Sequence, residues 1–276
     1  MNKVLKEYLE KGTLIAAHRG ASGGNIPFNT LAAFETALQQ GADIIETDVI
    51  KSTDGKMFIF HLQQEFNHLN RDICLTKMTE EEIRKVRYVN FDNNLTECPL
   101  PDLDEALEYL KGRCLVNLDH GWDGDWFENM IRVVRRHNMQ DQVLIKTPPT
   151  MKLLKMVEEQ APDFMYMPII QEKDECSEII EKMHINYVGA ELVFAHEDAE
   201  IAQPEYIAQQ QKKGRFLWVN AILYSYKVPL SAGHTDDVAV TGNPDHGWGW
   251  LVDRGFDVIQ TDWPGMLREY LNKRSN

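Results

Sequence analysis

The stretch that decides the fold reads GADIIETDVIKSTDGKMFIFH, residues 41–61. It consists of two apolar arms around a polar centre, and each arm has the composition of a buried strand. Glu46 and Asp48 nevertheless stand inside the first arm, and His61 closes the second. Side chains at i and i+2 of a strand point the same way, so the two carboxylates share a face. Burying an unpaired carboxylate costs several kcal/mol, and this face therefore needs a positive partner.

The centre of the stretch, STDGK, predicts a hairpin turn. The Asp-Gly pair at 54–55 is a strong signal for a two-residue turn, which would place Thr53 opposite Lys56. Counted back along the arms, this register puts Asp48 opposite His61. Directly opposed residues share a face, so we expect the hairpin to bring two carboxylates and an imidazole together.

Outward from the hairpin, short β-rich runs alternate with amphipathic helical patterns. Repeated βα units imply a parallel sheet, and eight of them favour a closed barrel. We therefore predict an α/β fold, a TIM (β/α)8 barrel formed by residues 1–276 as one domain, with the arm at 57–61 as a hairpin extension. The expected strands are 14–17, 43–49, 114–119, 143–147, 164–170, 187–194, 215–221 and 257–262, and the expected helices include 29–40, 79–88, 102–111, 125–137, 150–160 and 174–183.

Two segments interrupt this alternation. Residues 62–101 form a small insertion after the second strand, and residues 222–249 form a long loop after the seventh. In a barrel, the loops that follow strands lie at the active-site face. The sequence also contains a short internal echo, because GADIIETD at 41–48 recurs as GFDVIQTD at 255–262. We expect the two echoing segments to play the same part in a repeating architecture.

Other strands also carry polar residues at their carboxyl ends. The first strand runs into His18 and Arg19, the third ends with Asp119, and the fourth ends with Lys146. In a barrel these ends meet at one rim, so the side chains should join Glu46, Asp48 and His61 there. His120 should point away from Asp119 by strand alternation, and we do not assign it to the site.

The three carboxylates can be satisfied by one divalent cation. All-oxygen ligation favours Mg²⁺ or Ca²⁺, with Mn²⁺ as an alternative, over structural zinc. Hydrolysis of a phosphate ester uses such a set, since the ion stabilises developing charge and arginine offers a planar fork for two phosphate oxygens. Two histidines, His18 and His61, can act as acid and base because their ordinary pKa lies near working pH. The sequence does not show which histidine takes which role.

Composition limits the partners. The 276 residues carry a formal net charge of −14, which argues against a nucleic-acid or anionic-membrane surface. A small phosphodiester substrate remains compatible, because a local cation can reverse the charge inside a cleft. There is no apolar run long enough for an integral membrane segment, and the amino terminus has no apolar signal core. We expect a cytoplasmic protein, or a secreted or periplasmic one if a leader was removed.

The motifs resemble those of the glycerophosphodiester phosphodiesterases. They are HRG, PFNTLAAF, GADIIETDV, STDG, FH, LPDLDEAL, VNA and GFDVIQTDWP, and they follow the family's order from Leu14 to Trp263. The resemblance implies a TIM barrel that cleaves glycerophosphodiesters to sn-glycerol 3-phosphate and an alcohol. It also implies the roles of six residues: His18 and His61 as acid and base, Arg19 as phosphate clamp, and Glu46, Asp48 and Asp119 as metal ligands.

Three positions depart from the family's pattern. Phe28 replaces a glutamate, Leu62 replaces an aspartate after the histidine, and Gly121 stands where the family has a lysine. The missing lysine removes a cation from the phosphate site, and our hypothesis is that Lys146, one strand along, replaces it.

Two alternative functions remain open from the sequence. The same barrel could cleave head groups of lysophospholipids or sphingolipids in the manner of a phospholipase D, although a basic amphipathic membrane segment is missing. The chain could also bind a phosphate ligand without turnover, because of the changes at Phe28, Leu62 and Gly121.

Overall fold

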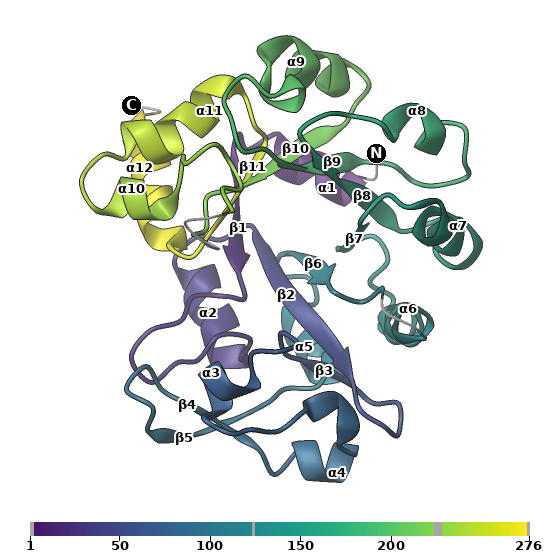
Figure 1. Ribbon diagram of the computed structural model, residues 1–276, viewed down its shortest axis with the longest axis vertical. Helices are drawn as coiled ribbons and strands as arrows, with labels where there is room; N and C mark the ends of the chain where they lie inside the picture. The colour runs from purple at the N-terminus through teal and green to yellow at the C-terminus, as the bar shows by residue number, and fades with distance from the viewer. Residues whose placement is uncertain (1–2, 123–124, 224–227, 275–276) are drawn as a thin grey trace.

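Eight parallel strands form the centre of the computed structural model, which describes residues 3–122, 125–223 and 228–274 (Figure 1). Each strand pairs with its neighbour in the order β2-β6-β7-β8-β9-β10-β11-β1, and β1 pairs with β2 to close the ring. The predicted TIM barrel is therefore confirmed. The strands are β1 (Leu14–His18), β2 (Ile44–Lys51), β6 (Leu115–Asp119), β7 (Val143–Thr147), β8 (Met165–Gln171), β9 (Gly189–Val193), β10 (Phe216–Asn220) and β11 (Val258–Thr261).

Helices surround the barrel and cover the outward side chains of its strands. Several begin at a residue whose side chain accepts a backbone N–H, such as Thr30, Asp102 and Thr150. Their apolar faces pack on outward residues such as Ile45 and Val49 to form the main core. The helices are α2 (Leu31–Gln39), α5 (Leu103–Leu110), α6 (Trp126–Arg136), α7 (Met151–Gln160), α8 (Ser177–Ile180), α9 (Pro204–Lys212), α10 (Asp236–Val240), α11 (Trp250–Arg254) and α12 (Pro264–Arg274), with a short 3-10 helix, η2 (Glu200–Ala202).

Polarity inside the barrel changes from one end of the strands to the other. At the amino-terminal end, inward residues such as Leu14, Ile44 and Leu115 form an apolar cluster, and Leu5 of α1 (Lys3–Leu9) joins it. Two residues further along β2, the inward position is Glu46. Strand alternation therefore explains how carboxylates can stand in an apolar run, because they continue an inward row that becomes polar toward the carboxyl end.

The hairpin register differs from the prediction by one residue. β3 (Met57–Ile59) pairs with β2 so that Lys51 lies opposite Met57, and the backbone N–H of Ser52 donates to the carbonyl of Lys56 at 2.9 Å. The loop thus has three residues, with Gly55 at φ +92°, rather than the expected two. The expected pairing of Asp48 with His61 was consequently wrong, although the two residues still lie close together beyond the end of the ladder.

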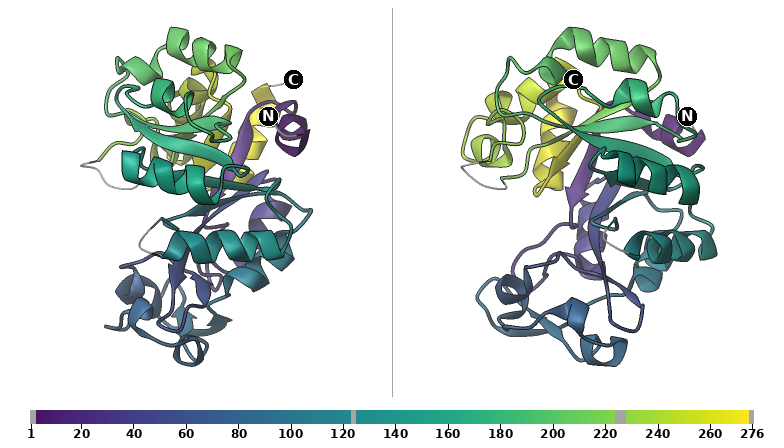
Figure 2. Two further views of the ribbon diagram at one scale, coloured as in Figure 1. Left: turned by 90° about the vertical axis from the view of Figure 1, so that its right-hand side faces the viewer. Right: turned by 45° about the vertical axis from the view of Figure 1, so that its right-hand side comes forward.

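The insertion at 62–101 shares a small apolar core with the hairpin, in which Phe58 and Phe60 of the hairpin arm and Tyr88 of the insertion are buried. It contains α3 (Glu65–Leu69), η1 (Leu75–Lys77), α4 (Glu80–Ile83), β4 (Arg87–Val89) and β5 (Leu95–Pro99). The helix predicted over 79–88 ends at Ile83, because the chain then enters the β4–β5 hairpin. Figures 1 and 2 show the insertion at the lower end of the molecule, below the barrel.

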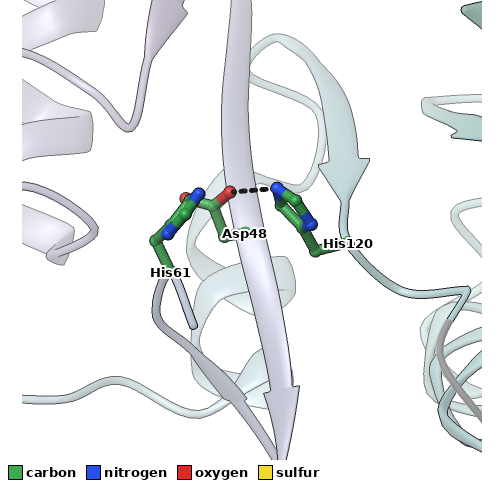
Figure 3. Close-up of side chains that lie close together, drawn as sticks. All are labelled: Asp48, His61 and His120. Atoms are coloured by element: carbon green, nitrogen blue, oxygen red, sulfur yellow. Dashed lines mark ion pairs between the residues drawn. The ribbon is translucent and has the colours of Figure 1, made fainter. Parts of the chain in front are cut away.

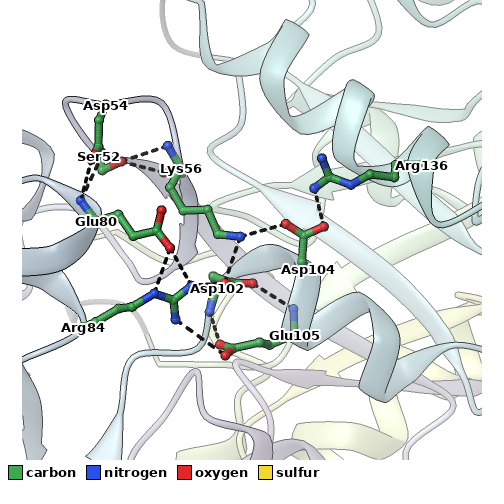
Figure 4. Close-up of polar contacts among 9 residues, drawn as sticks. All are labelled: Ser52, Asp54, Lys56, Glu80, Arg84, Asp102, Asp104, Glu105 and Arg136. Atoms are coloured by element: carbon green, nitrogen blue, oxygen red, sulfur yellow. Dashed lines mark hydrogen bonds and ion pairs between the residues drawn. The ribbon is translucent and has the colours of Figure 1, made fainter.

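Ion pairs attach this insertion to the barrel (Figure 4). Asp102, which directly precedes α5, accepts from Arg84, directly after α4, at 2.6 Å and lies 2.9 Å from Lys56 of the hairpin. Asp54 in the hairpin loop accepts the backbone N–H of Glu80 at 3.0 Å. The hairpin that carries the site therefore has a fixed place between α4 and α5.

The long segment at 222–249 is only partly a loop. Residues 224–227 lie outside the described residues. The remainder includes α10 and a π-helix, η3 (Asp245–Gly249), which continues directly into α11. No helix in the described part of the chain is long and apolar enough to span a membrane.

Candidate active site

A hollow of about 580 Å³ opens at the carboxyl ends of the barrel strands. Every residue that the sequence assigned to the site lines it: His18, Arg19, Glu46, Asp48, His61, Asp119 and Lys146. The structure therefore brings all of these side chains together, as the positions of the strand ends predicted.

The three predicted metal ligands come from two neighbouring strands. Asp48 of β2 lies beside Asp119 of β6 in the parallel register, and Glu46 precedes Asp48 on the same inward face. One oxygen atom from each of the three carboxylates lies within 4.8 Å of the others. Burial and the neighbouring charge of Asp48 raise the pKa of Glu46 to about 8.

This donor set fits a hard divalent cation. Four carboxylates line the hollow, including that of Glu191, against the two cations Arg19 and Lys146. When all four carboxylates are ionised, two negative charges are in excess, and a bound cation would favour the ionised form of Glu46. The buried Oδ1 atom of Asn117, which is the neighbour of Glu46 in the β2–β6 register, has no hydrogen-bond partner among the described residues. Carboxylate and amide oxygens are the ligands that Mg²⁺ and Ca²⁺ prefer.

Backbone conformation directs Arg19 at these carboxylates. Arg19 lies at φ +57°, its backbone N–H donates to a Glu46 carboxylate oxygen at 3.2 Å, and its Nε lies 2.9 Å from Asp48 Oδ2. Asn29 donates to the same Asp48 oxygen at 3.0 Å and accepts from Thr47 at 2.8 Å. Burial alone would raise the pKa of Asp48, but Arg19 and the nearby imidazoles outweigh it and lower that pKa.

The two predicted acid–base histidines have opposite electrostatic surroundings. His18 Nδ1 lies 2.8 Å from Asp262 Oδ1; burial lowers the pKa of His18, but the hydrogen bond and charge of Asp262 outweigh it and raise that pKa. His61 Nδ1 lies 2.8 Å from the carbonyl oxygen of Leu62. Burial, with Arg19 and another imidazole nearby, lowers the pKa of His61 despite the attraction of Asp48.

His120 also faces the hollow, contrary to expectation. Strand alternation fails at this position because β6 ends at Asp119 and His120 takes a left-handed conformation, φ +58°. Its Nε2 lies 3.9 Å from Asp48 Oδ1 (Figure 3). Its ring stacks on that of Trp122, with centroids 5.2 Å apart and an interplanar angle of 30°. By contrast, a side chain at Gly121 would point at Met130 and Val49, which belong to the main core.

Lys146 pairs with two carboxylates. Its Nζ lies 2.8 Å from Asp119 Oδ2 and 2.6 Å from Glu191 Oε2, and the side chain is buried. Burial lowers the pKa of Lys146, but the two carboxylates outweigh this effect and raise it. Glu191 also accepts from Asn220 at 2.8 Å, so a polar network continues around the barrel interior.

Sequence reasoning missed several residues that position the site: Asn29, His120, Glu191, Asn220, Gln260 and Asp262. A signal existed for two of them, because the echo between 41–48 and 255–262 aligns Gln260 with Glu46 and Asp262 with Asp48. Asn29 and Asn220 also stand inside two of the motifs that carry the resemblance, PFNTLAAF and VNA, whereas His120 and Glu191 have no comparable signal.

Comparison with known proteins gives a family model and several relatives. A family described as a domain of unknown function, DUF4996, matches residues 166–271. The glycerophosphodiester phosphodiesterase of Caldanaerobacter subterraneus is 31% identical over 141 residues, which cover 49% of this chain and 58% of that protein. A protein of the same name from Bacillus altitudinis is 34% identical over 39% of this chain and 44% of that protein. The chain thus matches about half the length of these curated relatives.

Solved structures match over nearly the whole chain. The glycerophosphodiester phosphodiesterase of Agrobacterium tumefaciens has a TM-score of 0.68 at 25% identity, over 92% of this chain and 97% of that one. A glycerophosphoryl diester phosphodiesterase from Parabacteroides distasonis has a TM-score of 0.79 at 18% identity, over 99% and 93%. An Oleispira antarctica phosphodiesterase, solved with the product sn-glycerol-3-phosphate, has a TM-score of 0.67 at 20% identity, over 96% and 99%. In sequence over about half its length, and in fold over nearly all of it, this chain is similar to glycerophosphodiester phosphodiesterases.

Proposed function

We propose that this chain is a metal-dependent phosphodiesterase that hydrolyses glycerophosphodiesters to sn-glycerol 3-phosphate and an alcohol. The observation that carries the proposal is one hollow lined by two histidines, an arginine and three close carboxylates. Such a set contains cation ligands, a phosphate clamp and two proton carriers. The names of the curated relatives and the product bound in the Oleispira antarctica structure support the substrate class.

In this proposal Glu46, Asp48 and Asp119 hold one divalent cation, Mg²⁺ or Ca²⁺, with Mn²⁺ as an alternative. When bound, the ion supplies positive charge at the phosphate oxygens as negative charge develops there. Arg19 pairs with Asp48 through Nε, and its terminal amino groups form the planar fork that clamps the phosphate. Lys146 has three N–H donors; two go to carboxylates, and the third is directed to the phosphate.

The surroundings of the two histidines support a division of roles. The carbonyl of Leu62 accepts from His61 Nδ1, so the neutral ring keeps its lone pair on Nε2, and the lowered pKa favours this base form. Asp262 favours the protonated form of His18. We therefore assign His61 as the base that deprotonates the nucleophile, and His18 as the acid that protonates the leaving alkoxide.

A coupled assay for release of sn-glycerol 3-phosphate tests this function over a panel of diesters that includes glycerophosphocholine. Turnover should disappear with a chelator and return when Mg²⁺, Ca²⁺ or Mn²⁺ is added. Glu46→Gln and Asp48→Asn should abolish metal binding measured by calorimetry, whereas Glu97→Gln, at an exposed residue of β5, should leave it intact. Metal binding that survives both site substitutions would refute the ligand assignment, and binding of diesters without turnover would identify a non-catalytic binding protein.

One surface feature favours the second candidate, cleavage of lysophospholipid or sphingolipid head groups. Phe66 and Phe91 are 69% and 91% exposed on the insertion, and Leu95 is 68% exposed nearby on β5. The two phenylalanines line a second hollow of about 580 Å³ with Phe28, whose ring centroid is 6.2 Å from that of His18. Higher turnover of micellar lipid than of soluble glycerophosphocholine, with the product identified by phosphorus NMR, would favour this candidate.

A further inference from the structure

His120 provides a donor that the proposed hydrolysis does not use. One donor atom from each of Asp48, His61 and His120 lies within 4.8 Å of the others. The two imidazole rings are 4.8 Å apart between centroids, and they flank the carboxylate of Asp48 (Figure 3). This cluster shares Asp48 with the three-carboxylate set but differs from it in having two nitrogen donors.

The hydrogen bonds around the cluster leave its donor atoms available. A carbonyl can only accept, so the contact with Leu62 O places the proton of neutral His61 on Nδ1 and the lone pair on Nε2. Histidines that bind metals commonly hold their other nitrogen in this way. Asp48 Oδ2 is taken by Arg19 and Asn29, whereas Oδ1 is the oxygen that faces His120.

Donor chemistry decides which ion such a cluster would take. Imidazole suits Zn²⁺ and other transition metals, whereas Mg²⁺ and Ca²⁺ prefer oxygen. Zn²⁺ bonds of about 2.0–2.2 Å imply donor atoms roughly 3.4 Å apart in a tetrahedron, so small rotations of the two rings would close the cluster. Bridged pairs of divalent ions are also familiar in enzymes that act on phosphate esters.

We propose that Asp48, His61 and His120 form a second cation site for a transition-metal ion, with Zn²⁺ as the expected occupant. Asp48 would be shared between this ion and the one held with Glu46 and Asp119. An ion on Nε2 of His61 would take the lone pair that accepts a proton, so Zn²⁺ should inhibit turnover. That consequence rests on the proposed function, whereas the binding itself does not.

Binding of Co²⁺, a spectroscopic probe for Zn²⁺ sites, tests the inference on the metal-stripped full chain. Saturating Mg²⁺ is present to occupy the all-oxygen site, and the visible absorption of Co²⁺ reports nitrogen ligation. The chain should bind one equivalent of Co²⁺, and Zn²⁺ should displace it. His120→Asn removes the imidazole but suits the left-handed backbone, because asparagine tolerates positive φ. Loss of a direct ligand should weaken binding at least about tenfold, since even loss of a residue that only hydrogen-bonds a metal ligand costs roughly 10- to 100-fold.

His61→Gln removes the other imidazole and should weaken Co²⁺ binding in the same way. The test therefore does not depend on a single variant that could misfold. His184→Asn is the matched control, at an exposed residue outside the hollow, and should bind Co²⁺ like the wild type. The inference would be overturned if the wild type bound no Co²⁺ with Mg²⁺ present, or if His120→Asn and His61→Gln both bound Co²⁺ with unchanged affinity. This test measures Co²⁺ binding and not turnover, so it does not depend on the proposed function. A chain that binds Co²⁺ but releases no sn-glycerol 3-phosphate in the coupled assay would refute the proposed function alone.

Discussion

His18 Nδ1 lies 2.8 Å from Oδ1 of Asp262, so a hydrogen bond joins residues at the ends of the first and the last barrel strands. Asp262 is itself held, because its backbone N–H donates to Asp236 at 2.8 Å. Asp236 in turn accepts from Thr261 and Trp248, both at 2.7 Å. A buried carboxylate at the start of α10 thus fixes the residue that orients His18.

Asp262→Asn should lower the pKa of His18. Burial lowers that pKa, and the hydrogen bond and the charge of Asp262 together outweigh burial. Histidine NMR titration of the metal-free protein would measure the shift. If His18 is the acid, less of it is protonated near neutral pH, and the falling limb of the pH–rate profile should move to lower pH.

Asp198→Asn is a suitable control, since this exposed aspartate lies outside the hollow. An unchanged His18 pKa in Asp262→Asn would contradict the orienting role. A change in stability without a change in the pH profile would contradict the acid role.

Lys146→Met should destabilise the protein. The ammonium pairs with Asp119 and Glu191 in a buried place, and its removal leaves their charges uncompensated. Breaking a buried pair in this way costs about 3–5 kcal/mol of unfolding free energy, to be measured by urea denaturation of the metal-free protein. Lys85→Met, which removes an exposed i,i+4 pair with Glu81, should leave the unfolding free energy almost unchanged.

The same variant tests the phosphate role of Lys146. If the third N–H of the ammonium binds the substrate, KM for a diester should rise under conditions where the variant is folded. Unchanged turnover and KM in Lys146→Met or Lys146→Ala would remove this residue from the phosphate site.

Gly121→Ala should destabilise the chain, because a side chain at this position would point into the main core and not into the hollow. A Cβ there would overlap Met130 Sδ and lie 3.2 Å from Val49 Cγ2. Overpacking of this kind costs about 1–3 kcal/mol of unfolding free energy. For the same reason Gly121→Lys should not deliver an ammonium to the phosphate site, although lysine stands at this position in the family's pattern.

A double-mutant cycle with Met130→Ala checks the packing argument. Met130→Ala alone should cost about 2–5 kcal/mol, and the double variant should cost less than the sum of the two single changes. Strict additivity would show that the two side chains do not compete for the same space.

Periodicity was enough to predict the barrel and most of the site. Alternate positions of a strand share a face, and strand ends share a rim, so Glu46, Asp48, Asp119 and Lys146 could be brought together without coordinates. The echo between 41–48 and 255–262 also indicated an equivalence that the structure bears out. Asp43 and Asp257, at matching places, each accept a backbone N–H from a strand neighbour, Ile15 and Leu217.

Local backbone geometry set the limit of prediction. Ser52, not Thr53, closes the hairpin, which moved the register by one residue. His120 was excluded because alternation was assumed to continue past Asp119, but a single left-handed residue turned it into the hollow. Neither feature follows from periodicity, since each depends on one or two backbone angles. The β4–β5 hairpin was missed because Arg87 and Tyr88 of β4 were assigned to the helical pattern at 79–88.

His68 should make the protein less stable at acidic pH. Its ring packs between Phe28 and Phe60, at centroid distances of 6.1 and 6.4 Å. Burial, with Arg19 and His61 nearby, lowers the pKa of His68 from 6.5 to about 4. Between these values the unfolded chain binds a proton that the folded chain does not, so unfolding becomes easier as pH falls. The resulting loss of unfolding free energy amounts to about 1–2 kcal/mol between pH 7 and pH 5, and this loss is complete below about pH 4.

His68→Phe removes the titrating group and keeps an aromatic ring in the same apolar surroundings. Urea unfolding of the metal-free protein at several pH values should therefore show a shallower loss of stability below pH 6.5 in this variant than in the wild type. His184→Gln, at an exposed histidine, should keep the pH dependence of the wild type. Parallel stability curves for His68→Phe and wild type would contradict the argument, because burial of a neutral imidazole must make protonation favour the unfolded chain.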